Sequence, residues 1–169
     1  MCMKNVNLNL VFCDMIPNQD GSDIALANFV GKQFKIQEEN GRRVLPQVSL
    51  TLFVSATQTK DPDEAARINP DITFSFENDY DIKVRLTETI SGSFMDLDSF
   101  LLEPAKHSIS ANLCRKTLNH TRLCVFQNIV LPEEKDNECF VIKALIRRHT
   151  QECNNESWAV QAIVPLKIN

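Results

Sequence analysis

The chain has 169 residues, of which 43% are hydrophobic and 24% charged, with a formal net charge of −4 and a pI near 5.4. These fractions are close to the averages for soluble globular domains, and a domain of this size buries roughly 70% of its unfolded surface. The acidic balance supplies no long-range positive field for phosphate groups. We therefore expect one folded domain, residues 1–169, that binds neither nucleic acid nor membrane.

The cysteine content and the N-terminal segment together indicate the cellular compartment of the protein. The sequence holds six cysteines, but VNLNLVF is too short and too rich in asparagine for a signal-peptide core. No apolar run approaches the roughly 18 residues that a membrane span needs. We expect a cytoplasmic protein with free thiols. The alternative is an extracellular, disulfide-stabilised domain, which the sequons at Asn119 and Asn155 would suit.

The first two expected strands lie within residues 7–36. Leu8, Leu10 and Phe12 alternate with polar residues and predict a strand whose other face carries Cys13. This strand is expected to end at Asp14, before a turn over 17–21. A second strand is expected over 26–36, with Gly31 as a bend or bulge.

The clearest period-two pattern is QVSLTLFVSAT at 47–57. The residues expected in the core are Val48, Leu50, Leu52, Val54 and Ala56. Gln47, Ser49, Thr51, Ser55 and Thr57 are expected to face water, and only Phe53 interrupts that polar face. A strand with one side on a core and one in solvent follows from this alternation.

A hairpin, one or two isolated helical turns and one short helix are expected in the middle of the chain. Residues 72–77 and 82–87 alternate around the turn residues 78–81, which predicts two strands joined by a turn. DEAARI at 63–68 predicts one or two helical turns. Ser93 is expected to cap a short helix beginning at Phe94 and ended by Pro104.

The C-terminal third predicts three further strands. Residues 123–131 and 139–146 are expected to form a strand, turn and strand unit around the polar segment 132–137. The last strand is expected over 158–168, with Pro165 at a sheet edge or bulge because it lacks an N–H. Trp158 is expected in the core, or at a sheet rim with its indole N–H bonded to a partner.

Eight or nine strands, turn-rich gaps and one short helical segment predict an all-β protein. One polar face per strand favours two sheets packed face to face, a single antiparallel β-sandwich.

The order of these features resembles a family of small uncharacterised bacterial proteins of unknown function. The resemblance is carried by the FCD strand end at 12–14, by LFVSAT, by FQNIVLPEE before CFVIKALI, and by IVPLKI near the C-terminus. It implies a compact cytosolic β-sandwich without known catalytic residues. The low glycine content and the long segment 94–118 depart from the pattern of that family.

Two His-x-x-x-Cys pairs, His120 with Cys124 and His149 with Cys153, raise the question of a zinc site. Residues four apart on a strand lie about 13 Å apart, too far to share one ion. A nucleophilic cysteine would need a base that the sequence does not place beside it. We therefore expect no metal site, no catalytic residues and no cofactor.

Acidic residues in two predicted loops are the remaining candidate site. They are Asp14, Asp20, Asp23, Glu77, Asp79 and Asp81. If both loops lie at one end of the sandwich, their oxygens would suit calcium or another loop-end ligand. The EF-hand spacing fails, since Gly21 would make Ile16 the first ligand. Solvated turn carboxylates are the alternative interpretation.

The sequence thus predicts a non-enzymatic binding or interaction module whose partner is a protein. We expect a monomer or homodimer, because an exposed edge strand would support dimerisation. Two alternatives stay open: a small hydrolase or transferase with a site assembled from distant residues, and an extracellular immunoglobulin-like adhesion domain.

Overall fold

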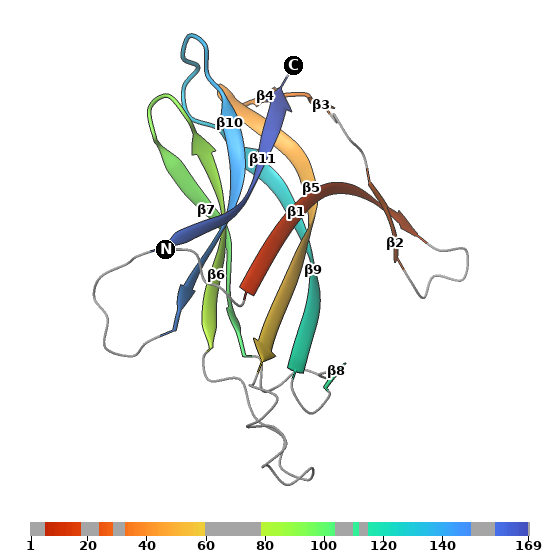
Figure 1. The fold of residues 1–169 in the computed structure, drawn as a ribbon. Helices are drawn as coiled ribbons and strands as arrows, with labels where there is room; N and C mark the ends of the chain where they lie inside the picture. Colours follow the sequence, from red (N-terminus) through yellow and green to blue (C-terminus); the bar gives the residue numbers. More distant parts are fainter. Residues whose placement is uncertain are drawn as a thin grey trace, which may run out of the picture.

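The computed structural model describes residues 6–17, 24–28, 33–59, 79–103, 110–111, 115–149 and 158–168. Within these ranges the protein contains eleven strands and no helix (Figure 1). The strands are β1 (Val6–Pro17), β2 (Ile24–Asn28), β3 (Gln33–Phe34), β4 (Gln37–Glu39), β5 (Arg42–Thr59), β6 (Tyr80–Glu88), β7 (Phe94–Leu102), β8 (Ser110–Ala111), β9 (Arg115–Val130), β10 (Phe140–Arg148) and β11 (Ala159–Ile168). The predicted all-β class is confirmed. The number of strands exceeds the prediction because β3, β4 and β8 are too short to show an alternating pattern.

The strands form two sheets, and the order of the strands determines which residues are neighbours on the outer face of each sheet. One sheet has the order β2-β1-β5-β9-β8, with β4 also paired to β5, and the other has the order β3-β11-β10-β6-β7. All pairs are antiparallel except β3 with β11. Contacts of β1 with β11 and β10 join the two layers. This arrangement confirms the predicted sandwich.

The predicted inward faces of β1 and β5 are confirmed. Their alternating apolar residues are buried in one core with those of β6 and β10, namely Leu8, Leu10, Phe12, Val48, Leu50, Leu52, Val54, Ala56, Ile82, Val84, Leu86, Phe140, Ile142, Ala144 and Ile146. The outer face of β5 differs from the prediction, because Ser49 and Thr51 are buried. The Thr51 hydroxyl donates to Cys13 Sγ at 3.3 Å. A hydroxyl with a local partner can be buried in the middle of a sheet at little cost.

The first strand is longer than predicted. It continues through Asp14 to Pro17 and pairs there with β2, so Asp14 lies opposite Ala27 and not in a turn. The expected single strand over 26–36 is also wrong, since β2 and β3 belong to different sheets. Gly31 lies outside the described residues, as do the hairpin strand expected over 72–77 and the helical turns expected over 63–68.

The helix expected from Phe94 is wrong, because this segment is the edge strand β7. Its register with β6 shifts between Val84 and Arg85, which lie opposite Asp98 and Asp96. A bulge of this kind adds one residue and changes which face the following side chains occupy. The resulting spacing of apolar residues resembled a helical stripe in the sequence.

The strand, turn and strand unit expected over 123–146 is wrong as a hairpin, and β11 contains a register shift. The segments expected as one hairpin, β9 and β10, lie in opposite sheets, so the loop between them crosses the end of the sandwich. In β11 the register shifts opposite Ala144 and Leu145, which places Val160 on the outer face with 48% of its surface exposed. Pro165 lies on β11 beyond its short pairing with β3, which agrees with an edge position.

The open side of the sandwich between β7 and β9 is closed by polar and aromatic side chains. Arg122 Nε donates to Asp98 Oδ2 at 2.9 Å, and the Arg122 guanidinium lies 4.2 Å from the centre of the Phe100 ring. An inward charge and a bulge on an edge strand oppose pairing with another chain. The β7 edge therefore has two of the features that prevent edge-to-edge association.

Candidate ligand-binding groove

The predicted acidic cluster is only partly within the described residues. Asp14 lies in β1, and Asp81 lies in β6 of the other sheet. The Asp81 carboxylate accepts hydrogen bonds from Arg147 Nε and pairs with His149 Nδ1, both at 3.0 Å. Asp79 precedes β6, whereas Asp20, Asp23 and Glu77 lie outside the described residues. A loop-end site built from these carboxylates stays a prediction.

The His-x-x-x-Cys motif at 120–124 lies on a strand, as the distance argument assumed. His120 and Cys124 both belong to β9. Burial, followed by the nearby Asp98 carboxylate, raises the pKa of the Cys124 thiol to about 11. A thiol with that pKa is protonated at neutral pH and is a poor nucleophile. Over the described ranges no three His, Cys, Asp or Glu side chains gather in a group suited to a metal ion.

The outer face of the sheet β7-β6-β10-β11 carries an unusual set of charges. Cross-strand pairing places Asp96, Arg85, Lys143 and Ile163 in one row across four strands. In an antiparallel sheet, side chains of directly opposite residues are about 4.5–5.5 Å apart at Cβ, and like charges there are destabilising. Arg85 and Lys143 are such a pair. The fold therefore holds two cations side by side at a cost in stability.

One carboxylate compensates Arg85 of this row and the neighbouring Lys83. Asp96 Oδ1 accepts from Arg85 Nε at 2.7 Å, and Asp96 Oδ2 lies 3.3 Å from Lys83 Nζ. Burial raises the pKa of Asp96, but the hydrogen bonds and charges of Arg85 and Lys83 outweigh it and hold that pKa below its usual value. Within the described part of the chain, Lys143 has no carboxylate partner. Two cations thus share one carboxylate, and Lys143 lies beside Arg85 without one.

Two aromatic rings accompany these cations. Lys83 Nζ lies 4.9 Å and Arg147 Cζ 4.4 Å from the centre of the Trp158 ring. The Arg85 guanidinium lies 3.9 Å from the centre of the Phe94 ring. Such cation–π contacts orient long side chains that would otherwise move freely in water. Lys83, Arg85 and Arg147 are therefore held in place on this face.

A groove of about 380 Å³ lies among these side chains. It is lined by Arg85, Thr87, Thr89, Gly92, Phe94, Lys143, Leu145, Trp158 and Val160. Leu145 is 3% exposed although it belongs to the outer face of β10, which makes it an apolar floor. The groove thus combines an apolar floor with cationic and aromatic walls, the composition of a site that takes an anionic ligand with an apolar portion.

The groove also contains two buried polar atoms without a partner. Thr87 Oγ1 and Trp158 Nε1 are the buried side-chain nitrogen or oxygen atoms of the described residues that form no hydrogen bond. Thr87 is 8% exposed. Buried polar atoms are normally hydrogen-bonded, and those left unpaired are often functional. The expected position of Trp158 at a sheet rim is consistent with the structure, but its N–H has no partner among the described residues.

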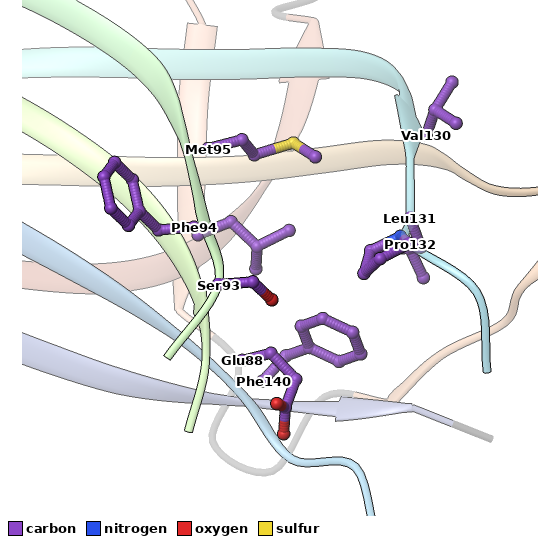
Figure 2. Close-up of a pocket in the computed structure, with 9 residues that line it drawn as sticks. Glu88, Ser93, Phe94, Met95, Val130, Leu131, Pro132 and Phe140 are labelled. Carbon is purple, nitrogen blue, oxygen red and sulfur yellow. The ribbon is translucent and has the colours of Figure 1, made fainter. Parts of the chain in front are cut away.

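A second hollow of about 230 Å³ lies at the mouth between the two sheets (Figure 2). Its lining is mainly apolar and comes from β6, β7, the end of β9 and the start of β10: Leu86, Glu88, Ser93, Phe94, Met95, Val130, Leu131, Pro132 and Phe140. Figure 2 shows Met95 and Phe94 on opposite sides of β7. We refer to this hollow as the mouth pocket and to the cationic hollow as the outer groove.

Glu88 fixes the chain segments around the mouth pocket. Its carboxylate accepts the backbone N–H groups of Ile90, Ser91 and Cys139 at 3.0, 2.6 and 3.3 Å. It thereby joins the β6–β7 turn to the start of β10. The hydrogen bond from the Ser91 side chain, and then these N–H groups, lower the pKa of Glu88 to about 2.

Replacing Glu88 with glutamine is expected to lower the melting temperature at neutral pH. Because the pKa of Glu88 falls from 4.5 to about 2 on folding, its ionised form stabilises the fold above pH 4.5. That contribution is lost as the pH falls from 4.5 toward 2. Thermal melts of Glu88→Gln and wild type should therefore differ at pH 7 and converge near pH 2. Glu133→Gln, at an exposed loop position, is the control. A constant difference at both pH values would contradict this account.

The residues of the outer groove were not identified from the sequence. Arg85 and Thr87 alternate with core residues, and so does Lys143, so their common outward face was readable strand by strand. The pairing of β6 with β10 brings them together, and no local pattern encodes that register. The position of Trp158 beside them depends on the irregularity between β10 and β11.

Comparisons with protein-family models, with curated proteins and with solved structures find no match to this chain. The resemblance to small bacterial proteins is therefore untested. Over the ranges that the structure describes, no helix has the length and apolar character needed to cross a membrane.

Proposed function

We propose that this protein is a non-enzymatic interaction module that binds an acidic, extended segment of a partner protein in the outer groove. The observation that carries the proposal is that Lys83 and Arg85 share the single carboxylate of Asp96, while Lys143, directly opposite Arg85, has no carboxylate partner among the described residues. A bound carboxylate would relieve the repulsion between Arg85 and Lys143. The stability lost in the free protein is thereby recovered on binding.

The spacing of the cations favours an extended peptide over a small anion. Lys83 and Arg85 are alternate residues of one strand, so their side chains repeat about every 6.8 Å. Alternate side chains of an extended peptide repeat at the same interval. Arg147, which forms an ion pair with Asp81, adds a further cation on β10. Several carboxylates on one peptide can therefore meet several cations at once.

The free thiols support a reducing compartment for this function. Cys13, Cys124 and Cys139 form no disulfide. Cys13 and Cys124 are buried in the fold as small apolar side chains. We infer a cytoplasmic protein, as the sequence predicted.

Equilibrium binding of fluorescently labelled peptides tests the proposal. A polyglutamate peptide should bind at low salt, and its affinity should fall on the order of tenfold at high salt because exposed charges are screened. Inorganic phosphate and citrate at the same concentration should compete weakly, since each meets only part of the row. A polylysine peptide that binds equally well, or a polyglutamate peptide that does not bind, would overturn the proposal.

A further inference from the structure

We infer that the acidic segment bound in the outer groove also carries an apolar side chain that enters the mouth pocket. This inference rests on the proposed function and adds a second point of recognition. It assigns to the partner an acidic stretch and, on one side of it beyond a short spacer, a leucine-sized residue.

The outer groove and the mouth pocket are continuous. Phe94 lines both the outer groove and the mouth pocket. Its neighbours on the turn divide between them, since Gly92 and Thr89 line the groove and Ser93 lines the pocket. The two hollows therefore meet at the tip of the β6–β7 hairpin.

The strand β7 lies at the edge of its sheet. The sheet order ends with β7, and Figure 2 shows Phe94 on one side of this strand and Met95 on the other. A peptide lying on the outer face thus needs only to pass round one strand to reach the mouth between the sheets. Phe94 is 59% exposed at this crossing and offers an apolar surface to the peptide.

The mouth pocket stays accessible, whereas the rest of this side of the sandwich is closed. Farther along β7, the Asp98–Arg122 ion pair bridges the two sheets. At the pocket, the facing side chains are Met95 from β7 and Val130 from the end of β9, and Val130 is 41% exposed. A space of about 230 Å³ accepts one branched aliphatic side chain.

The chemistry of the pocket selects an apolar group. The Glu88 carboxylate at its margin is already bonded to three backbone N–H groups. Leu86, Leu131 and Phe140 supply apolar walls that are themselves buried. Removal of a leucine side chain from water into such a space is favourable, whereas a charged side chain would lose its hydration without a free partner.

Two matched peptides test the inference on the full-length protein. Each consists of consecutive glutamates, two glycines and a final leucine or alanine, and each is also made in the reverse order. In one of the two orders, the leucine peptide should bind about tenfold more tightly than its alanine counterpart. The Val130→Trp variant, which fills the pocket from an exposed position, should remove this gain and leave the affinity for the alanine peptide unchanged.

Val125→Trp is the control variant, because Val125 is an exposed residue of the same strand outside the pocket. Equal binding of the leucine and alanine peptides to wild type in both orders would overturn the inference and leave the proposed function standing. The inference would also be overturned if the Val130→Trp variant still bound the leucine peptide more tightly than the alanine peptide. Failure of every acidic peptide to bind would overturn both the inference and the proposed function.

Discussion

Replacing Lys143 by glutamate is expected to make the protein more stable and, at the same time, to abolish its binding of an acidic peptide. In the wild type, Lys143 lies directly opposite Arg85 and has no carboxylate partner in the described part of the chain. A glutamate there would pair with Arg85, and such cross-strand changes contribute about 0.5–1 kcal/mol, less where solvent screens the pair. Urea denaturation measures the stability and peptide titration the binding.

The control for this variant is Lys35→Glu, which makes the same change of net charge at an exposed position between β3 and β4. It should change neither stability nor peptide affinity appreciably. A Lys143→Glu variant that is less stable than wild type would show that Arg85 and Lys143 do not repel one another. A Lys143→Glu variant that still binds polyglutamate would show that Lys143 does not belong to the binding site.

Truncating Leu50 to alanine is expected to cost about 2–5 kcal/mol of the free energy of unfolding. Leu50 is fully buried at the centre of β5, opposite Phe12 on β1 and Cys124 on β9. Its removal leaves a cavity between the two sheets that the surrounding strands cannot fill without shifting. Urea denaturation of the variant measures the loss.

Phe53→Ala is the matched control on the same strand, since Phe53 is 44% exposed on the outer face. Its truncation should cost less than half as much, although more atoms are removed. If Phe53→Ala proved the more damaging of the two, the register of β5 would be shifted by one residue, because such a shift exchanges the two faces.

The alternation of apolar and polar residues within single strands was the sequence feature that predicted the structure most reliably. It identified the buried faces of β1, β5 and β6 because each of these strands has one face on the core. It failed where a strand contains an irregularity. The bulge in β7 produced an apparent helical stripe, and the irregularity opposite Leu145 turned Val160 outward.

The candidate site could not be predicted from the sequence, for a different reason. The groove combines residues of four strands, and Arg85 and Lys143 are brought together by the pairing of β6 with β10. Sequence reasoning emphasised carboxylates in loops, since sandwich folds often carry recognition there. In the structure, Asp81 belongs to a strand and forms ion pairs with Arg147 and His149. Its role next to the groove is to hold a cation in place.

The fluorescence of Trp158 during titration with polyglutamate tests the central claim most directly. Trp158 is the only tryptophan of the chain, and it lines the outer groove between Lys83 and Arg147. A peptide bound there changes the environment of the indole. The emission should shift saturably in wild type at low salt, and it should not shift in Lys143→Glu. Binding that leaves the Trp158 emission unchanged would contradict the assignment of the groove as the recognition site.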